Sequence, residues 1–90
     1  MTIARRVFYD GRVQGVGFRF TTRQVARGYE VTGWVRNLPD GRVELEAAGE
    51  PEEVEAFLKG IRNGPLGSNI RNVTIEEIPV TPGQKGFTIQ

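Results

Sequence analysis

The order of apolar patterns along the chain is the strongest constraint on its fold. Two segments have apolar residues at helical spacing: residues 19–27 and the stretch that begins at Pro51. Segments with strand-like alternation precede, separate and follow them within 90 residues. The order strand, helix, strand, strand, helix, strand is typical of a split βαβ arrangement. Such a chain places both helices on one face of a single sheet, which gives two packed layers.

The individual elements have clear local signals. Alternation of Val31, Gly33 and Val35 with polar neighbours predicts a strand that ends near Asn37, before the turn signal of residues 38–41. The other predicted strands are residues 6–13, residues 42–47, a segment with Val73, Ile75 and Ile78, and a short last strand with Phe87 and Ile89. We therefore predict an α+β, ferredoxin-like two-layer sandwich (βαββαβ plus a short C-terminal strand) with a mostly antiparallel sheet and two helices on one face.

Most charged side chains are expected in water. In residues 42–47, Val43, Leu45 and Ala47 alternate with charged residues, so Glu44 and Glu46 should lie on a solvated face. The same expectation applies to six arginines: Arg5, Arg6, Arg12, Arg23, Arg27 and Arg36. The net charge of +1 is too balanced to indicate nucleic acid as the main partner.

Missing residue types restrict the chemistry. The chain has no cysteine and no histidine, which excludes disulfides, thiolate catalysis and the commonest general base. Most zinc sites are excluded for the same reason. We therefore expect no metal and no cofactor, and an enzyme of this composition would work by positioning and electrostatics rather than through a covalent nucleophile.

The length and the apolar pattern indicate one small domain, residues 1–90. No apolar run is long enough for a membrane-spanning helix, and the first residues lack the apolar core of a secretory signal. We expect a cytoplasmic protein that is a monomer and has no membrane association.

A glycine-rich loop joins the first predicted strand to the first helix. Its residues Gln14, Gly15, Val16, Gly17, Phe18 and Arg19 form a candidate phosphate-binding loop. Glycines let backbone amides turn towards an anion, and the first turn of the helix adds free amides and a positive dipole end. The Arg19 guanidinium can bind two phosphate oxygens. The dinucleotide-binding fingerprint Gly-x-Gly-x-x-Gly needs a third glycine at position 20, which is Phe. The Gly-Lys-Ser/Thr ending of a Walker loop is also absent. From spacing alone, a simple turn with a solvated Arg19 remains the alternative.

Asn37 is the second candidate site residue. A helical crossover makes the first two strands parallel, so their carboxyl ends meet at one edge of the sheet. The loop follows the first of these strands and Asn37 ends the second. An amide side chain can accept a hydrogen bond from water and donate one to a phosphoryl group. The alternative interpretation is an ordinary turn residue.

Two blocks of sequence are similar to those of the acylphosphatase family. They are Gly11-Arg12-Val13-Gln14-Gly15-Val16-Gly17-Phe18-Arg19 and Gly33-Trp34-Val35-Arg36-Asn37, in family order and spacing. The second helix and Phe87-x-Ile89 extend the resemblance over nearly the whole chain. The resemblance implies a ferredoxin-like fold and metal-free hydrolysis of acyl phosphates to carboxylate and inorganic phosphate. It also implies that Arg19 is the phosphate ligand and that Asn37 orients the water. We expect broad specificity for the acyl group.

One position departs from the family pattern. Glu30 stands where relatives usually have glycine, and Gly28 lies two residues earlier. A left-handed backbone at Glu30 would cost about 1 kcal/mol. We expect instead that the first helix ends slightly sooner.

Two other functions are compatible with this fold class. The first is a non-catalytic phosphate- or RNA-binding module, but strand 42–47 lacks the aromatic residues on which such domains stack bases. The second is an accessory domain, because similar sequences open larger carbamoyl-transfer proteins of hydrogenase maturation. We expect a stand-alone hydrolase that acts on small acyl phosphates and releases inorganic phosphate.

Overall fold

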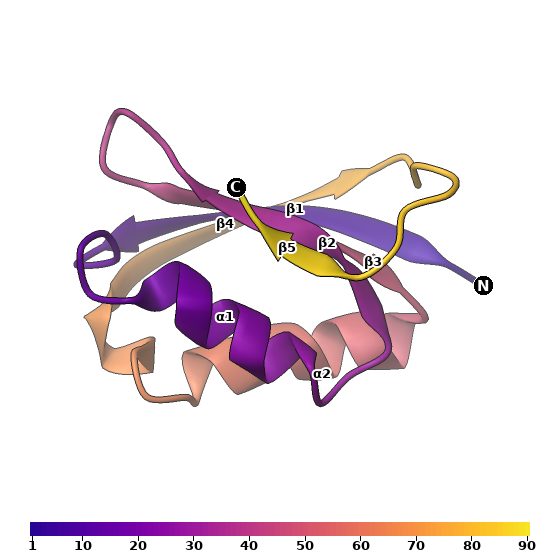
Figure 1. The fold of residues 1–90 in the computed structure, drawn as a ribbon, viewed down its shortest axis with the longest axis horizontal. Helices are drawn as coiled ribbons and strands as arrows, with labels where there is room; N and C mark the ends of the chain where they lie inside the picture. The colour runs from indigo at the N-terminus through magenta and orange to yellow at the C-terminus, as the bar shows by residue number, and fades with distance from the viewer.

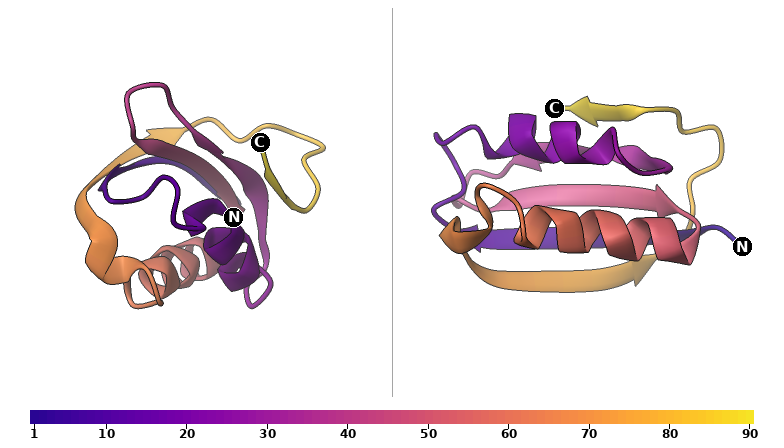
Figure 2. Two further views of the ribbon diagram at one scale, coloured as in Figure 1. Left: turned by 60° about the vertical axis from the view of Figure 1, so that its left-hand side comes forward. Right: turned by 90° about the horizontal axis from the view of Figure 1, so that it is seen from below.

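The computed structural model describes residues 1–90 and confirms the predicted fold class (Figure 1). The elements are β1 (Ile3–Gly11), α1 (Phe18–Ala26), β2 (Val31–Asn37), β3 (Val43–Gly49), α2 (Pro51–Arg62), the 3₁₀ turn η1 (Gly67–Asn69), β4 (Ile70–Ile78) and β5 (Phe87–Ile89). The sheet has the order β4-β1-β3-β2-β5, and only the β2–β5 pair is parallel. Both helices cover the same face of the sheet (Figure 2). Neither helix has the length and apolar character needed to cross a bilayer.

The boundaries of the first strand and first helix differ slightly from the prediction. β1 ends at Gly11 rather than near residue 13, so Val13 lies in the loop, where it is nevertheless buried. α1 ends at Ala26, one residue sooner than expected. Only glycines have positive φ, so Glu30 is not strained. Its backbone N–H instead donates a hydrogen bond to Glu53 Oε1 at 2.7 Å.

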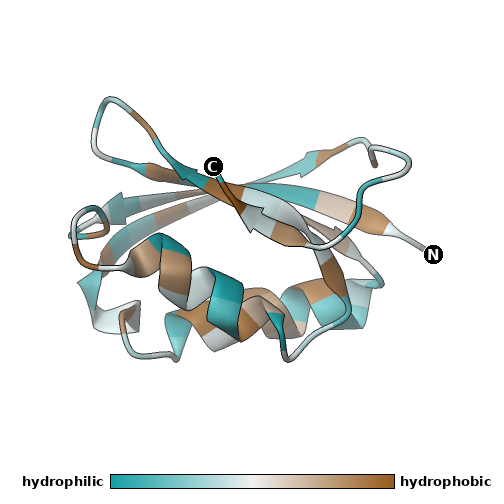
Figure 3. Ribbon diagram, viewed as in Figure 1, coloured by the Kyte–Doolittle hydropathy of each residue, from teal (hydrophilic) through white to brown (hydrophobic).

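The two helical stripes form the core against the sheet. Phe18, Thr22 and Ala26 of α1 are buried, as are Val54, Phe57 and Ile61 of α2. Except for Phe18, these residues lie in the two segments with apolar residues at helical spacing, and apolar and polar residues alternate around both helices in Figure 3. The Phe57 and Phe87 rings meet edge to face with centroids 5.3 Å apart. This contact fixes the short edge strand β5 to the core.

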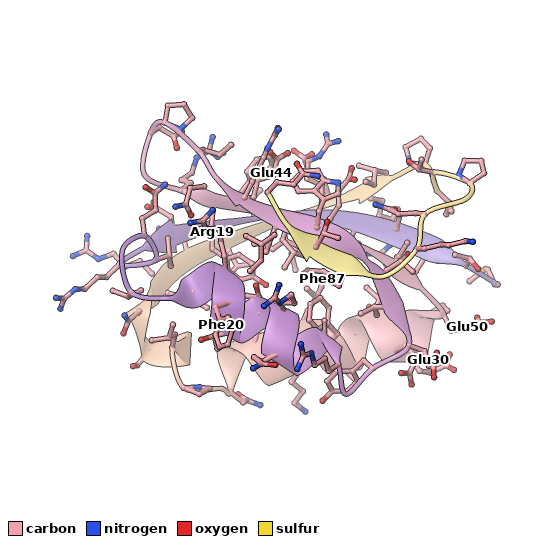
Figure 4. All side chains as sticks on the ribbon, viewed as in Figure 1. Arg19, Phe20, Glu30, Glu44, Glu50 and Phe87 are labelled. Atoms are coloured by element: carbon pink, nitrogen blue, oxygen red, sulfur yellow. The ribbon has the colours of Figure 1, made fainter.

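The opposite, open face of the sheet corrects the expectation for Glu44. Its side chain is only 8% exposed, although Figure 4 places it on the face away from the helices. Arg6 Nε lies 3.3 Å and Arg36 Nη2 2.8 Å from its carboxylate oxygens, and Arg6 also pairs with Glu46 at 3.1 Å. Strand register causes this burial, because Arg36 stands directly opposite Glu44 and Arg6 opposite Glu46. Arg6 and Arg36 are therefore ion-paired rather than simply solvated.

Candidate active site

The predicted meeting of the loop and Asn37 at one sheet edge is borne out by the strand pairing. β1 and β2 flank β3 and both run antiparallel to it, so they are parallel to each other. The loop after β1 and the last residue of β2 consequently reach the same edge. A pocket of about 180 Å³ lies there. It is lined by Val13, Gly15, Gly17, Phe18, Arg19, Phe20, Asn37 and Ile89.

The loop has the backbone conformation of an anion cradle. Gly15 and Gly17 have φ of 75° and 82°, in the left-handed region that side chains disfavour. A Cβ at either position would meet nothing within 4 Å, so the backbone conformation, rather than space, favours glycine there. Gly17 is the N-cap of α1. The amides of the first helical turn have no acceptor within the helix and carry the positive end of its dipole.

Arg19 projects from the first turn of α1 into the space beside β5 (Figure 4). Its Nη1 donates a hydrogen bond to the main-chain oxygen of Gln90 at 2.9 Å. The Gln90 N–H in turn donates to the Val35 carbonyl at 2.8 Å. No Asp or Glu side chain forms an ion pair with Arg19. The Arg19 guanidinium is therefore held in place at the pocket without an acidic side chain beside it.

Asn37 brings an unpartnered acceptor to the pocket. Its Oδ1 is buried and has no hydrogen-bond partner within the protein. A buried acceptor without a partner costs folding free energy, so such atoms are rare unless a ligand or water completes them. A water molecule held by this oxygen would lie in the pocket that Arg19 also lines.

Gln14 connects the loop to the hairpin that follows Asn37. Its Nε2 donates hydrogen bonds to the Leu38 carbonyl at 2.8 Å and to the Arg42 carbonyl at 2.9 Å. Asp40 closes the same turn by accepting from the Arg42 N–H at 3.0 Å. That hydrogen bond also lowers the pKa of the Asp40 carboxyl. The Gln14 side chain therefore sets the position of the loop relative to Asn37.

The pocket contains most, but not all, of the predicted site residues. Gly15, Gly17, Phe18, Arg19 and Asn37 line it, whereas Gln14 and Val16 do not. Sequence reasoning missed Val13, Phe20 and Ile89 as lining residues. Ile89 comes from the far end of the chain, and only the parallel pairing of β5 with β2 brings it there. No group of three or more acidic, histidine or cysteine side chains is placed to hold a metal ion.

For the expected hydrolysis of acyl phosphates, Gln14→Ala should lower kcat about tenfold. The loop would shift relative to Asn37, and the reacting atoms would no longer be aligned. Loss of two partly buried hydrogen bonds should also reduce the free energy of unfolding by about 1–2 kcal/mol. Steady-state kinetics and urea unfolding measure the two effects. Gln24→Ala, on the exposed face of α1, is the control. An unchanged kcat in Gln14→Ala would show that the Gln14 hydrogen bonds to Leu38 and Arg42 do not align the site.

Known proteins share both the sequence and this structure. The acylphosphatase family model matches residues 5–89. An acylphosphatase of Rubrobacter xylanophilus is 45% identical over 85 residues, which is 94% of this chain and 77% of that protein. The crystal structure of acylphosphatase from Bacillus subtilis has a TM-score of 0.89 at 36% identity and covers 100% of this chain and 99% of that one. Full-length HypF in its phosphate- and nucleotide-bound form has a TM-score of 0.86 at 30% identity, over 12% of that chain.

Proposed function

The chain belongs to the acylphosphatase family, and from this premise we propose that it hydrolyses acyl phosphates in the pocket of Arg19 and Asn37. Acyl phosphates are carboxyl-phosphate anhydrides, and their hydrolysis gives a carboxylate and inorganic phosphate. One observation carries the assignment of the site: the glycine loop, an arginine without an acidic side-chain partner and an unpartnered asparagine oxygen line a single pocket.

The phosphate of the substrate binds to the loop and to Arg19. Backbone amides from Gly15 to Arg19 and the Arg19 guanidinium donate to the phosphoryl oxygens, where negative charge is concentrated in the transition state. The contact of Arg19 with Gln90 positions the guanidinium before substrate arrives. This prior positioning lowers the reorganisation needed during reaction.

Asn37 holds the attacking water. Its Oδ1 accepts a hydrogen bond from the water, which places the water oxygen in line with the bond between phosphorus and the acyl oxygen. The water oxygen bonds to phosphorus, the P–O bond to the acyl group breaks, and the carboxylate leaves with the bond electrons. A phosphate oxygen takes the water proton. The carboxylate is a good leaving group, so the reaction needs no histidine.

RNA binding, the alternative for this fold, is disfavoured by the open face of the sheet. RNA-binding domains of this type stack bases on exposed aromatic rings. Here Arg42 lies 4.8 Å from the Phe8 ring centroid and Arg36 lies 5.0 Å from that of Trp34. An arginine therefore stands over each of these partly exposed rings, and Glu44 and Glu46 lie on the strand between them. Absence of nucleic-acid binding, the monomeric state, the single domain and the cytoplasmic location remain predictions.

Benzoyl phosphate provides the direct test, because its ultraviolet absorbance falls on hydrolysis. We expect rapid loss of absorbance with purified protein in the presence of EDTA, with one inorganic phosphate released per benzoate. A folded protein that binds inorganic phosphate but hydrolyses nothing would contradict catalysis and leave the phosphate-binding module. Activity that EDTA abolishes and an added divalent metal restores would contradict the metal-free reaction.

A further inference from the structure

A second pocket is lined by residues of α1, β2 and β5, and α1 and β5 also contribute Arg19 and Ile89 to the candidate active site. The elements α1 and β5 lie next to each other in the fold (Figure 2). Arg19 of α1 donates a hydrogen bond to Gln90, the residue just after β5. One helical turn beyond Arg19, Arg23 lines the second pocket, and so does Phe87, two strand residues before Ile89 of the first pocket. A helical turn rises about 5.4 Å and two strand residues about 6.6 Å. The second pocket therefore begins about one short acyl chain from the phosphate loop.

The second pocket has an apolar floor and a basic rim. Its volume is about 470 Å³. Ala26, Tyr29, Val31 and Phe87 supply apolar surface, and Gly86 leaves the β5 side open. Arg23 and Arg27 supply two positive charges, and no acidic residue is among the seven that line the pocket.

The arginines of the rim have no acidic partner within the protein. Neither Arg23 nor Arg27 forms an ion pair, and the Arg23 Nε is buried without an acceptor. The Arg23 side chain is therefore only partly exposed to water. The Arg23 guanidinium lies 5.5 Å from the centroid of the Phe20 ring, a residue of the phosphate pocket that is 52% exposed. Arg19, Arg23 and Arg27 are spaced by four residues, and like charges at this spacing destabilise a helix.

We propose that this second pocket binds the acyl part of the substrate and that Arg23, assisted by Arg27, binds an anionic group carried by that part. The preferred substrates are acyl phosphates whose acyl group carries a second negative charge, such as a carboxylate, beyond a short apolar stretch. The apolar floor takes the stretch and the unpaired guanidinium takes the charge. This inference rests on the proposed function and narrows the broad acyl specificity that the sequence suggested.

The test compares two rigid substrates of similar size, 4-carboxybenzoyl phosphate and 4-methylbenzoyl phosphate. We expect kcat/KM of the protein to favour the carboxylate substrate about tenfold, because a hydrogen bond to a charged group has that order of effect. In Arg23→Gln, kcat/KM should fall about tenfold more for the carboxylate substrate than for the methyl substrate, and the preference should disappear. Arg23→Lys keeps the charge and should keep part of it. Arg71→Gln, which removes an unpaired exposed arginine on β4, should leave the preference intact.

Each outcome decides a different point. A preference of the original protein that disappears in Arg23→Gln and partly returns in Arg23→Lys supports the acyl pocket. The acyl pocket is overturned if the original protein shows no preference for the carboxylate substrate, or if Arg23→Gln keeps that preference. Hydrolysis of the methyl substrate would show in both cases that the proposed function still holds. If the folded protein hydrolyses neither substrate, the proposed function itself fails, and the acyl pocket with it. Thermal melting confirms that each variant is folded.

Discussion

Arg19→Ala should lower kcat/KM for benzoyl phosphate by more than ~10³-fold, because one lost transition-state donor alone costs about 10²–10³. Arg19 offers two donors and a full positive charge, and no other cation lines the phosphate pocket. Its loss should therefore weaken phosphate binding as well as catalysis. Steady-state kinetics, together with inhibition by inorganic phosphate, measures both effects.

Controls separate this catalytic effect from a structural one. Arg19 makes one exposed hydrogen bond, to Gln90, and no ion pair, so the free energy of unfolding should change by at most about 1 kcal/mol. Arg19→Lys keeps the charge but loses the planar fork, and should recover only a small part of the activity. Arg71→Ala removes an exposed arginine at the start of β4 that does not line the pocket, and should leave kinetics unchanged. Near-normal kcat/KM in a folded Arg19→Ala would exclude Arg19 as the phosphate ligand.

The sequence predicted the fold because the signals involved are local, whereas the roles of Arg19 and Asn37 came from the resemblance to a family and remain predictions. The helical stripes, the turn at residues 38–41 and the glycine loop each lie within a few consecutive residues. The crossover rule then joined Arg19 and Asn37 at one sheet edge without any distance information. Gly33 shows the limit of this reasoning. A Cβ there would stand 1.8 Å from the Glu46 carbonyl oxygen, a contact set by strand pairing alone.

Features that depend on pairing between distant segments could not be predicted from the sequence. Glu44 was assigned to water because its own strand alternates, but the neighbouring strands place Arg6 and Arg36 over it. Gln14 was assigned to the loop, and its side-chain bonds to Leu38 and Arg42 needed the hairpin in place. The acyl pocket depends on β5, three residues long and distant in sequence from α1. Such contacts follow from tertiary packing, which residue patterns do not encode locally.

Asn37→Ala should lower kcat about 10²–10³-fold while KM and phosphate inhibition change little, because the water loses its alignment and the phosphate ligands remain. Asn37→Asp keeps the size but adds a negative charge beside the phosphate, so its KM should rise as well. Asn72→Ala, on the exposed edge strand β4, is the matched control and should retain full activity.

The stability of Asn37→Ala distinguishes a site residue from a turn residue. An asparagine that held the turn through its side chain would lose stability on truncation. Asn37 Oδ1 has no partner within the protein, so its removal takes away a buried acceptor whose desolvation is uncompensated. We therefore expect the free energy of unfolding to stay the same or to rise, by up to about 1 kcal/mol, as is common when a functional group is removed. Urea unfolding measures it. A variant that loses stability and activity together would instead assign Asn37 to the turn, and the water would need another ligand.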